Sequence, residues 1–223
     1  MRAYHEPDAS NVRVLEQSWR IPKSVHRIAE GVINRVEKRW AKTYLPRESE
    51  GAVEGYGDIG LVPPPRPNES TLVLYRNHQF RRAVENWLMD SSVPFIATGG
   101  TWSPFEGRWA TALRAVFDLK GAGETSTGRI ASLGKCAPDR LARIKAGDKE
   151  GLRHDPHDLI PVPEPIASYL RRVDLNARPE VTISTIHAAK GAEADRVVLL
   201  TGQGERTWED SGGDAEHRTF YVG

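Results

Sequence analysis

Five residues with ligand-binding chemistry lie between two predicted strands in the last quarter of the chain. They are Thr185, His187, Lys190, Gly191 and Glu193. The segment Val181–Thr185 is rich in β-branched residues and predicts a strand, and Arg196–Leu200 has the apolar run typical of a strand buried on both faces. Polar groups at strand ends form the usual ligand sites of α/β sheets. The alternative is a loop with one helical turn whose charges face water.

A second candidate set precedes a predicted helix near the start of the chain. Residues Val12–Trp40 contain apolar side chains at helical spacing after Pro22, which fits a first helical position: Val25, Ile28, Ala29, Val32, Ile33, Val36 and Trp40. Arg20 stands just before this helix, where its charge opposes the helix dipole unless an anion such as phosphate is bound. Trp19 beside it offers a flat ring for stacking on a base. Alternatively, Trp19 belongs to the core and Arg20 pairs with a surface acid.

A third set follows another strand. Thr71–Tyr75, a helix at Gln79–Met89 and Pro94–Ala97 predict a βαβ unit. Arg76, Asn77 and His78 come directly after the first of these strands. They would therefore lie at the carboxyl edge of a parallel sheet, where ligands bind. A solvated helix start is the alternative, because cations at strand ends also cap turns.

Composition limits the possible classes of protein. The chain has 223 residues, 27% of them charged, and a formal net charge of +1, so a nucleic-acid site would have to be a local basic patch. A single cysteine, Cys136, excludes an internal disulfide and fits a reducing compartment. No apolar run approaches transmembrane length and no signal-peptide core is present. We therefore expect a cytoplasmic protein that has no membrane partner.

The remaining segments suggest how the domain is divided. Residues 44–68 are rich in glycine and proline and predict a connector, and 202–213 predict a loop. Between residues 101 and 178, amphipathic stretches at Glu106–Lys120, Pro138–Ala146 and Pro165–Val173 predict a small helical insertion. We therefore assign residues 1–100 and 179–223 to one α/β domain and 101–178 to the insertion.

Two further patterns in the insertion do not indicate sites. Gly128–Cys136 resembles a phosphate-binding loop, but the spacing of its glycines is wrong and no hydroxyl residue follows Lys135. His154, Asp155, His157 and Asp158 lie in a proline-rich loop with no distant third ligand, so we predict no metal site there.

The segment Val181–Gly202 resembles motif V of the UvrD/Rep/PcrA helicases, superfamily 1 motors that move 3′ to 5′ on DNA. The family pattern T-x-H-x-x-K-G-x-E is supplied in register from Thr185 to Glu193, with departures at Ala192 and Asp195–Arg196. Residues 15–33 resemble motif IV with Trp19 in place of tyrosine, and Tyr75–Gly100 is similar to the family's Y-R-T-N-x-Q-x-R segment. Asp214–Gly223 resembles the start of motif VI but stops before its arginine.

The resemblance implies an α/β fold: a RecA-like parallel sheet flanked by helices, with no P-loop of its own and with the small helical insertion. It implies ATP contacts by Gln17, Trp19, Arg20, Lys190, Gly191 and Glu193, in which Trp19 stacks on adenine and Arg20 acts catalytically on the γ-phosphate. It implies DNA contacts by Arg76, His78, Thr185 and His187. Asparagine is usual in the family where this chain has His78.

The chain would then be the second motor domain of an ATP-dependent DNA helicase. The sequence lacks both the Walker pattern and an acidic D-E-x-x box, so the Mg²⁺ ligands would lie on an N-terminal RecA-like domain that acts as its partner. We expect the chain alone to bind ATP weakly without hydrolysing it, and the complete motor to act on single-stranded or tailed duplex DNA. A non-catalytic DNA- or protein-binding module of the same shape is the main alternative.

Overall fold

The computed structural model describes residues 16–37, 39, 43–98, 103–121, 123–148, 152–202 and 205–222. The chain forms two compact units, which are treated separately below. The sheet unit comprises Tyr56–Gln203, and the terminal unit combines Met1–Gly55 with Gly204–Val222. The predicted insertion belongs to the sheet unit, so the division into units does not coincide with the boundaries predicted at residues 100 and 179.

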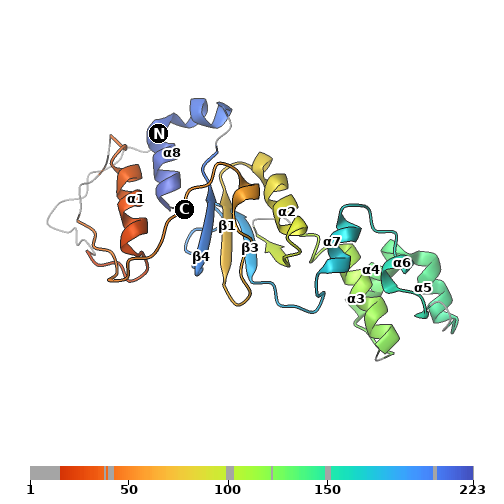
Figure 1. Cartoon of the computed structure of the whole chain (residues 1–223). Helices are drawn as coiled ribbons and strands as arrows, with labels where there is room; N and C mark the ends of the chain where they lie inside the picture. Colours follow the sequence, from red (N-terminus) through yellow and green to blue (C-terminus); the bar gives the residue numbers. More distant parts are fainter. Residues whose placement is uncertain are drawn as a thin grey trace. The chain divides into compact units, whose positions relative to one another are not determined.

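A four-stranded parallel sheet forms the centre of the sheet unit (Figure 1). Its order is β2-β3-β1-β4, with β1 at Thr71–Tyr75, β2 at Phe95–Ala97, β3 at Val181–Thr185 and β4 at Arg196–Leu200. All five residues of β1 are buried, as its continuous apolar run predicts for an interior strand. The predicted α/β class is confirmed, and the all-parallel sheet is consistent with a RecA-like fold.

The predicted βαβ unit forms with one strand inserted into it. After β1 come a 3-10 turn, η3 (His78–Phe80), and helix α2 (Arg81–Asp90), and the chain then returns as β2. Strand β2 pairs with β3 rather than with β1, so the crossover skips one strand. Buried Val84, Trp87 and Leu88 of α2 share one core with Val73 and Tyr75 of β1. The Trp87 indole also donates to Val62 O at 3.1 Å, which secures the connector that contains η2 (Ile59–Leu61).

The described residues of the insertion form five helices. They are α3 (Arg108–Gly121), α4 (Thr127–Cys136), α5 (Pro138–Lys145), α6 (Pro156–Leu159) and α7 (Ile166–Arg172). Leu113, Val116 and Leu133 are fully buried, whereas Phe117 is exposed. The P-loop-like segment Gly128–Cys136 falls within α4, where the helix itself uses the backbone amides. In the part of the chain that the structure describes, no group of His, Cys, Asp and Glu side chains could hold a metal ion.

Three side chains fasten the insertion to the sheet layer. The half-buried Arg114 guanidinium donates to Leu175 O at 2.7 Å and to Phe105 O at 3.0 Å, joining the two connections that enter and leave the insertion. Arg172 of α7 donates to Ser92 Oγ and Met89 O, both at 2.8 Å. The Tyr169 hydroxyl donates to Val93 O at 3.0 Å. These backbone oxygens lose water when the two layers pack, and the charged and phenolic donors replace the lost hydrogen bonds.

In the terminal unit, helix α1 (Lys23–Ile33) packs on helix α8 (Glu205–Val222). Two predictions were wrong here. Helix α1 exposes Val25 and Ile28, which were predicted to be buried, and buries His26. The loop predicted for 202–213 is mostly helix, because α8 begins at Glu205. Residues 12–15 and Trp40 of the first predicted helix lie outside the described residues.

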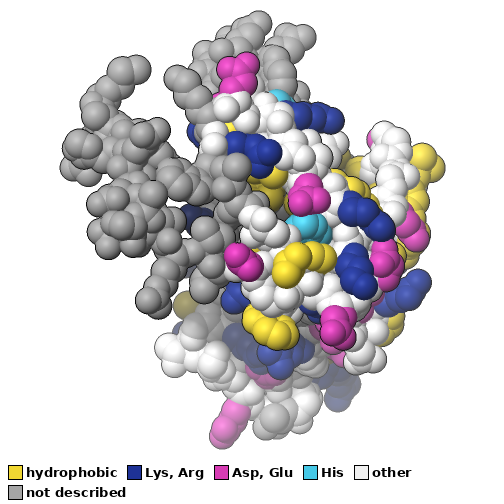
Figure 2. Space-filling model, turned by 90° about the vertical axis from the view of Figure 1, so that its left-hand side faces the viewer, with side chains coloured by type: hydrophobic (Ala, Val, Ile, Leu, Met, Phe, Trp, Pro, Cys, Tyr) yellow, Lys and Arg dark blue, Asp and Glu magenta, His cyan; other side chains and the backbone are white. Residues whose placement is uncertain are grey.

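Figure 2 shows the side on which Figure 1 draws α1. In the coloured part of this face, Lys and Arg side chains alternate with Asp and Glu, and the apolar side chains are scattered. This mixture agrees with the near-zero net charge and provides no extended basic surface in the coloured part. The described helices also include none that is long and apolar enough to cross a bilayer.

Arg114→Ala is expected to lower the free energy of unfolding by about 2–3 kcal/mol, because it removes a charged donor from two carbonyls. The comparison variant is Arg171→Ala, whose partner Asp158 lies 2.9 Å away in an exposed pair, and its cost should stay below about 1 kcal/mol. Urea denaturation of both variants measures the difference. Equal losses would show that Arg114 does not join the two connections.

His157 predicts a pH dependence of stability. Burial lowers the pKa of this imidazole below its usual value, with Asp155 opposing the shift, and the ring packs edge-on against Phe117 at 5.8 Å between centroids. Because the folded pKa is the lower one, the contribution of His157 is complete above the unfolded pKa of about 6.5 and is lost as the pH falls below it.

Urea midpoints at about pH 7.5 and about pH 5 should therefore differ less in His157→Gln than in the unchanged chain. His154→Gln, at an exposed histidine of the same loop, should retain the full difference. Identical pH profiles for His157→Gln and the unchanged chain would contradict the expectation.

Candidate functional site

The carboxyl ends of the strands meet at one edge of the sheet. Tyr75, the last residue of β1, lies opposite Thr185 in β3 and Leu200 in β4, and Ala97 of β2 lies opposite Ile183. Residues that follow these strands therefore emerge side by side. The predicted DNA contacts Arg76, His78, Thr185 and His187 come from the ends of β1 and β3. Because these two strands are neighbours, the structure brings all four residues to the same edge.

A tight turn follows β3 and positions His187. The Thr185 hydroxyl accepts from Ala188 N at 3.2 Å, and Thr185 O accepts from Ala189 N at 3.0 Å. Ile186 is buried, and its amide donates to Tyr75 O at 3.1 Å, extending the pairing of β1 with β3 by one residue. His187, next in the chain, is exposed. Thr185 therefore holds the turn together, and His187 faces solvent directly beside the edge.

The predicted ATP contacts Lys190, Gly191 and Glu193 lie on the segment between this turn and β4, and all three are exposed. Gly191 adopts a φ of +87°, in the left-handed region that favours glycine. At the far end of the segment, the Asp195 carboxylate accepts from Ser70 N at 3.0 Å and Ser70 Oγ at 2.6 Å. Both bonds lower the pKa of Asp195, and the bond from the Ser70 hydroxyl has the larger effect. The segment is thus anchored at both ends and presents its three polar positions between them.

Asp195 and Arg196, where the sequence departs from the helicase pattern, have structural partners. Asp195 fastens the loop to the start of β1, and the Arg196 guanidinium donates to Pro63 O at 2.8 Å and Pro64 O at 3.1 Å. Both side chains connect the start of β4 to segments that precede β1. In this structure both side chains therefore serve to anchor the loop and the start of β4.

In the terminal unit, Trp19 and Arg20 project from a turn organised by Ser18. The buried Ser18 hydroxyl accepts from Arg20 N at 3.3 Å and from Ile21 N at 3.2 Å. Trp19 is 83% exposed, so it is not a core residue of its unit, and Arg20 is exposed as well. A tryptophan this exposed is uncommon, because its large apolar area is normally buried.

The other groups around this turn are already engaged. The Gln17 side-chain amide donates to Ser18 O at 2.9 Å and Pro46 O at 3.0 Å, which leaves its amide oxygen to meet a ligand. Lys23 N and Ser24 N, the first two amides of α1, donate to Ser49 O and Glu50 O at 3.1 and 2.9 Å. An anion beside Arg20 would therefore be bound by the guanidinium and not by these two helix amides.

The predicted ATP contacts divide between the two units. Gln17, Trp19 and Arg20 form a cluster on the terminal unit, and Lys190, Gly191 and Glu193 form another on the sheet unit. Each cluster is a local surface of its own unit. The predicted DNA contacts, in contrast, all belong to the sheet unit.

Sequence analysis missed a polar network beneath the edge. The Thr98 hydroxyl donates to Ser184 Oγ at 2.8 Å, and the Ser184 hydroxyl donates to Thr185 O at 3.1 Å. Ser184 is fully buried in β3, and a serine inside a predicted strand is the signal that could have revealed it. Tyr75 is also fully buried, and its hydroxyl has no hydrogen-bond partner among the described residues. Tyr75 is the last residue of β1 and Ser184 is the second-last residue of β3, so both lie directly under the candidate site.

Gly191→Ala should lower the free energy of unfolding by about 1–2 kcal/mol, because alanine disfavours a positive φ. A Cβ added to this residue would have no atom within 4 Å, so the backbone conformation alone sets the cost. Gly128→Ala tests the opposite case: this glycine lies in α4 with equally open surroundings, and alanine there should be neutral or stabilising by up to about 1 kcal/mol. Urea denaturation measures both, and a neutral Gly191→Ala would contradict the conformational role.

Comparison with known proteins identifies no family. No protein-family model matches the sequence, and no curated protein matches it.

Proposed function

We propose that this chain supplies the second RecA-like motor domain of an ATP-dependent 3′–5′ DNA helicase or translocase of the UvrD type. One observation carries the proposal: the segment from Thr185 to Glu193 leaves the carboxyl end of an interior strand in a parallel sheet. Sheets of this class bind their ligands at that edge. The residues that resemble the helicase motif therefore occur where such a motif can function.

The nucleotide half of the proposal rests mainly on Trp19 and Arg20. An exposed indole beside an exposed guanidinium suits an adenine ring and a phosphate, respectively. Trp19 would stack on the base, and Arg20 would neutralise charge developing on the γ-phosphate. Lys190, Gly191 and Glu193 would contact the ribose side, and Gln17 would contribute its amide oxygen.

The DNA half rests on the edge formed by Arg76, His78, Thr185 and His187. A cationic group, two imidazoles and a hydroxyl can contact phosphate and sugar without reading base sequence. Closing and reopening of a nucleotide cleft would then move a single strand across this edge. The substrate would be single-stranded or tailed duplex DNA.

Phosphoryl transfer needs more groups than this sequence contains. A phosphate cradle and magnesium ligands must act together with an arginine, and the sequence has neither a Walker pattern nor a D-E-x-x box. An N-terminal RecA-like domain would supply both, and the Mg²⁺ that it holds would neutralise charge on the β- and γ-phosphates. This chain would position the nucleotide, provide Arg20 and grip the DNA.

In the complete motor, Arg20→Ala is expected to reduce kcat for ATP hydrolysis by about 10³–10⁵-fold, the range found for arginine fingers. Binding of single-stranded DNA in the absence of nucleotide should be unaffected. Arg27→Ala is the matched control, because Arg27 is an exposed arginine in α1 whose partner is Glu50. Steady-state turnover with saturating DNA measures the effect, and an unchanged kcat in Arg20→Ala would remove the catalytic assignment.

A non-catalytic binding module is the second candidate, since the sequence lacks the phosphate loop and Gln17 donates its amide to the backbone. Such a module would bind single-stranded DNA in a salt-dependent manner with no response to ATP in the presence of any P-loop partner. The same DNA-binding measurement, made with and without ATP, separates the two functions.

A further inference from the structure

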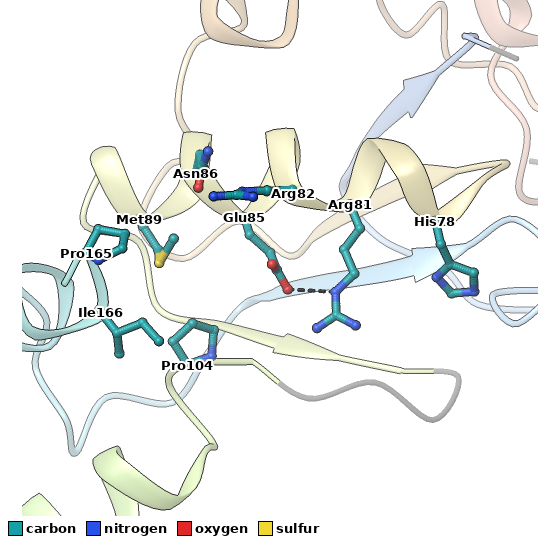
Figure 3. A pocket seen from close by; sticks show the side chains of 9 residues that line it. All are labelled: His78, Arg81, Arg82, Glu85, Asn86, Met89, Pro104, Pro165 and Ile166. Atoms are coloured by element: carbon teal, nitrogen blue, oxygen red, sulfur yellow. Dashed lines mark hydrogen bonds and ion pairs between the residues drawn. The ribbon is translucent and has the colours of Figure 1, made fainter. Parts of the chain in front are cut away.

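A groove runs along one face of α2 in the sheet unit, with a volume of about 440 Å³ (Figure 3). Its first wall is formed by His78 of η3 and by residues of α2 that recur at helical spacing: Arg81, Arg82, Glu85, Asn86 and Met89. The facing wall consists of Pro104 together with Pro165 and Ile166 at the start of α7. The groove therefore lies between the sheet layer and the insertion, and the predicted DNA contact His78 is at one end of it.

The charges in the groove are unequal. Arg81 Nε is 2.7 Å from Glu85 Oε1, and both side chains are about one-fifth exposed, so this pair largely neutralises itself. Arg82 is exposed and makes no hydrogen bond or ion pair with any of the described residues. The first turn of α2 contains no acidic residue that would balance it. The groove therefore keeps one uncompensated positive charge, which favours an anionic ligand.

The two ends of the groove differ in polarity. Figure 3 shows His78 at one end and Met89, Pro165 and Ile166 at the other, with Arg81 and Glu85 between them. Met89 and Pro104 are buried at the apolar end. A ligand with an anionic group next to a flat apolar ring would match both ends.

A buried tyrosine, Tyr75, lies beside the His78 end of the groove without lining it. Its side chain is fully buried, and its hydroxyl lacks a hydrogen-bond partner in the described part of the chain. The Tyr75 ring lies edge-on to His78, with 5.9 Å between centroids, and the charges of Arg81 and Glu85 both act on its hydroxyl. Buried hydroxyl groups are nearly always hydrogen-bonded in folded proteins. The Tyr75 hydroxyl is an exception, and because it is inaccessible it does not itself contact a ligand in the groove.

We propose that this groove, which we call the α2 groove, binds one nucleotide unit of single-stranded DNA. The phosphate would contact Arg82, and the base would lie against Met89, Pro104 and Ile166. The proposal rests on the proposed function, because His78 connects the α2 groove to the edge formed by Arg76, Thr185 and His187. A strand that crosses this edge would continue along α2 toward the insertion.

Two substitutions with opposite expected effects test the proposal. Binding of a fluorescently labelled oligothymidylate of about 16 nucleotides is measured by anisotropy over a range of salt concentrations. Arg82→Gln should weaken binding and lower the slope of log K against log salt by about 0.7, the value for one phosphate contact to a single strand. Glu85→Gln removes the negative charge beside Arg81 and should tighten binding at low salt.

Matched controls separate a site effect from a change in total charge. Arg153→Gln and Glu124→Gln alter exposed residues of the insertion that do not line the α2 groove, and they change the net charge in the same ways. His187→Ala tests the sheet edge and therefore the proposed function.

The groove proposal is supported if Arg82→Gln lowers the slope more than Arg153→Gln, and if Glu85→Gln tightens binding more than Glu124→Gln. If each groove variant behaves like its control while His187→Ala weakens binding, the groove proposal is overturned and the proposed function stands. If the unchanged chain binds no oligothymidylate even at low salt, both proposals fail.

Discussion

The parallel register of β1 with β3 and β4 is the constraint on which the candidate site depends. It places Tyr75, Thr185 and Leu200 level with one another, so the chain leaves neighbouring strands at one edge. A shift of one residue would turn the buried side chains of these strands to the opposite face. The buried apolar side chains of β1 and β3 therefore hold the register, and the register brings the polar residues together.

The same arrangement explains how this site can be exposed and still be anchored to the sheet. Buried Ile186, the Thr185 hydroxyl and the Asp195–Ser70 bonds fasten the loop after β3 at each end. Between these anchors, His187 and Glu193 remain exposed. Polar residues carried on a short, doubly anchored loop lose less conformational freedom on binding than residues on a free loop would.

The insertion is fastened to the sheet by hydrogen bonds to carbonyl groups. Arg114, Tyr169 and Arg172 bond to backbone oxygens in the two connections and at the end of α2. Burial lowers the pKa of Arg114, yet an arginine keeps its charge at any physiological pH, so this joint does not depend on proton uptake. The facing wall of the α2 groove, which includes Ile166 of α7, is held in place by these bonds.

The sequence by itself determined those helices and strands that can be recognised from the pattern of their own residues. An apolar run indicated β1, helical spacing indicated α2, α3 and α7, and β-branched residues indicated β3. The polar residues after β1 and β3 could be recognised as candidates because their strands could be recognised.

Only the tertiary structure decided which strands are neighbours, that β2 pairs with β3, and that Val25 and Ile28 are exposed while Trp19 lies on the surface. It also decided that α8 continues through Gly212–Gly213 and that α2 and α7 enclose a groove. The physical reason is that periodicity within a short segment shows which face is apolar, whereas pairing, burial and cavities depend on residues far away in the chain.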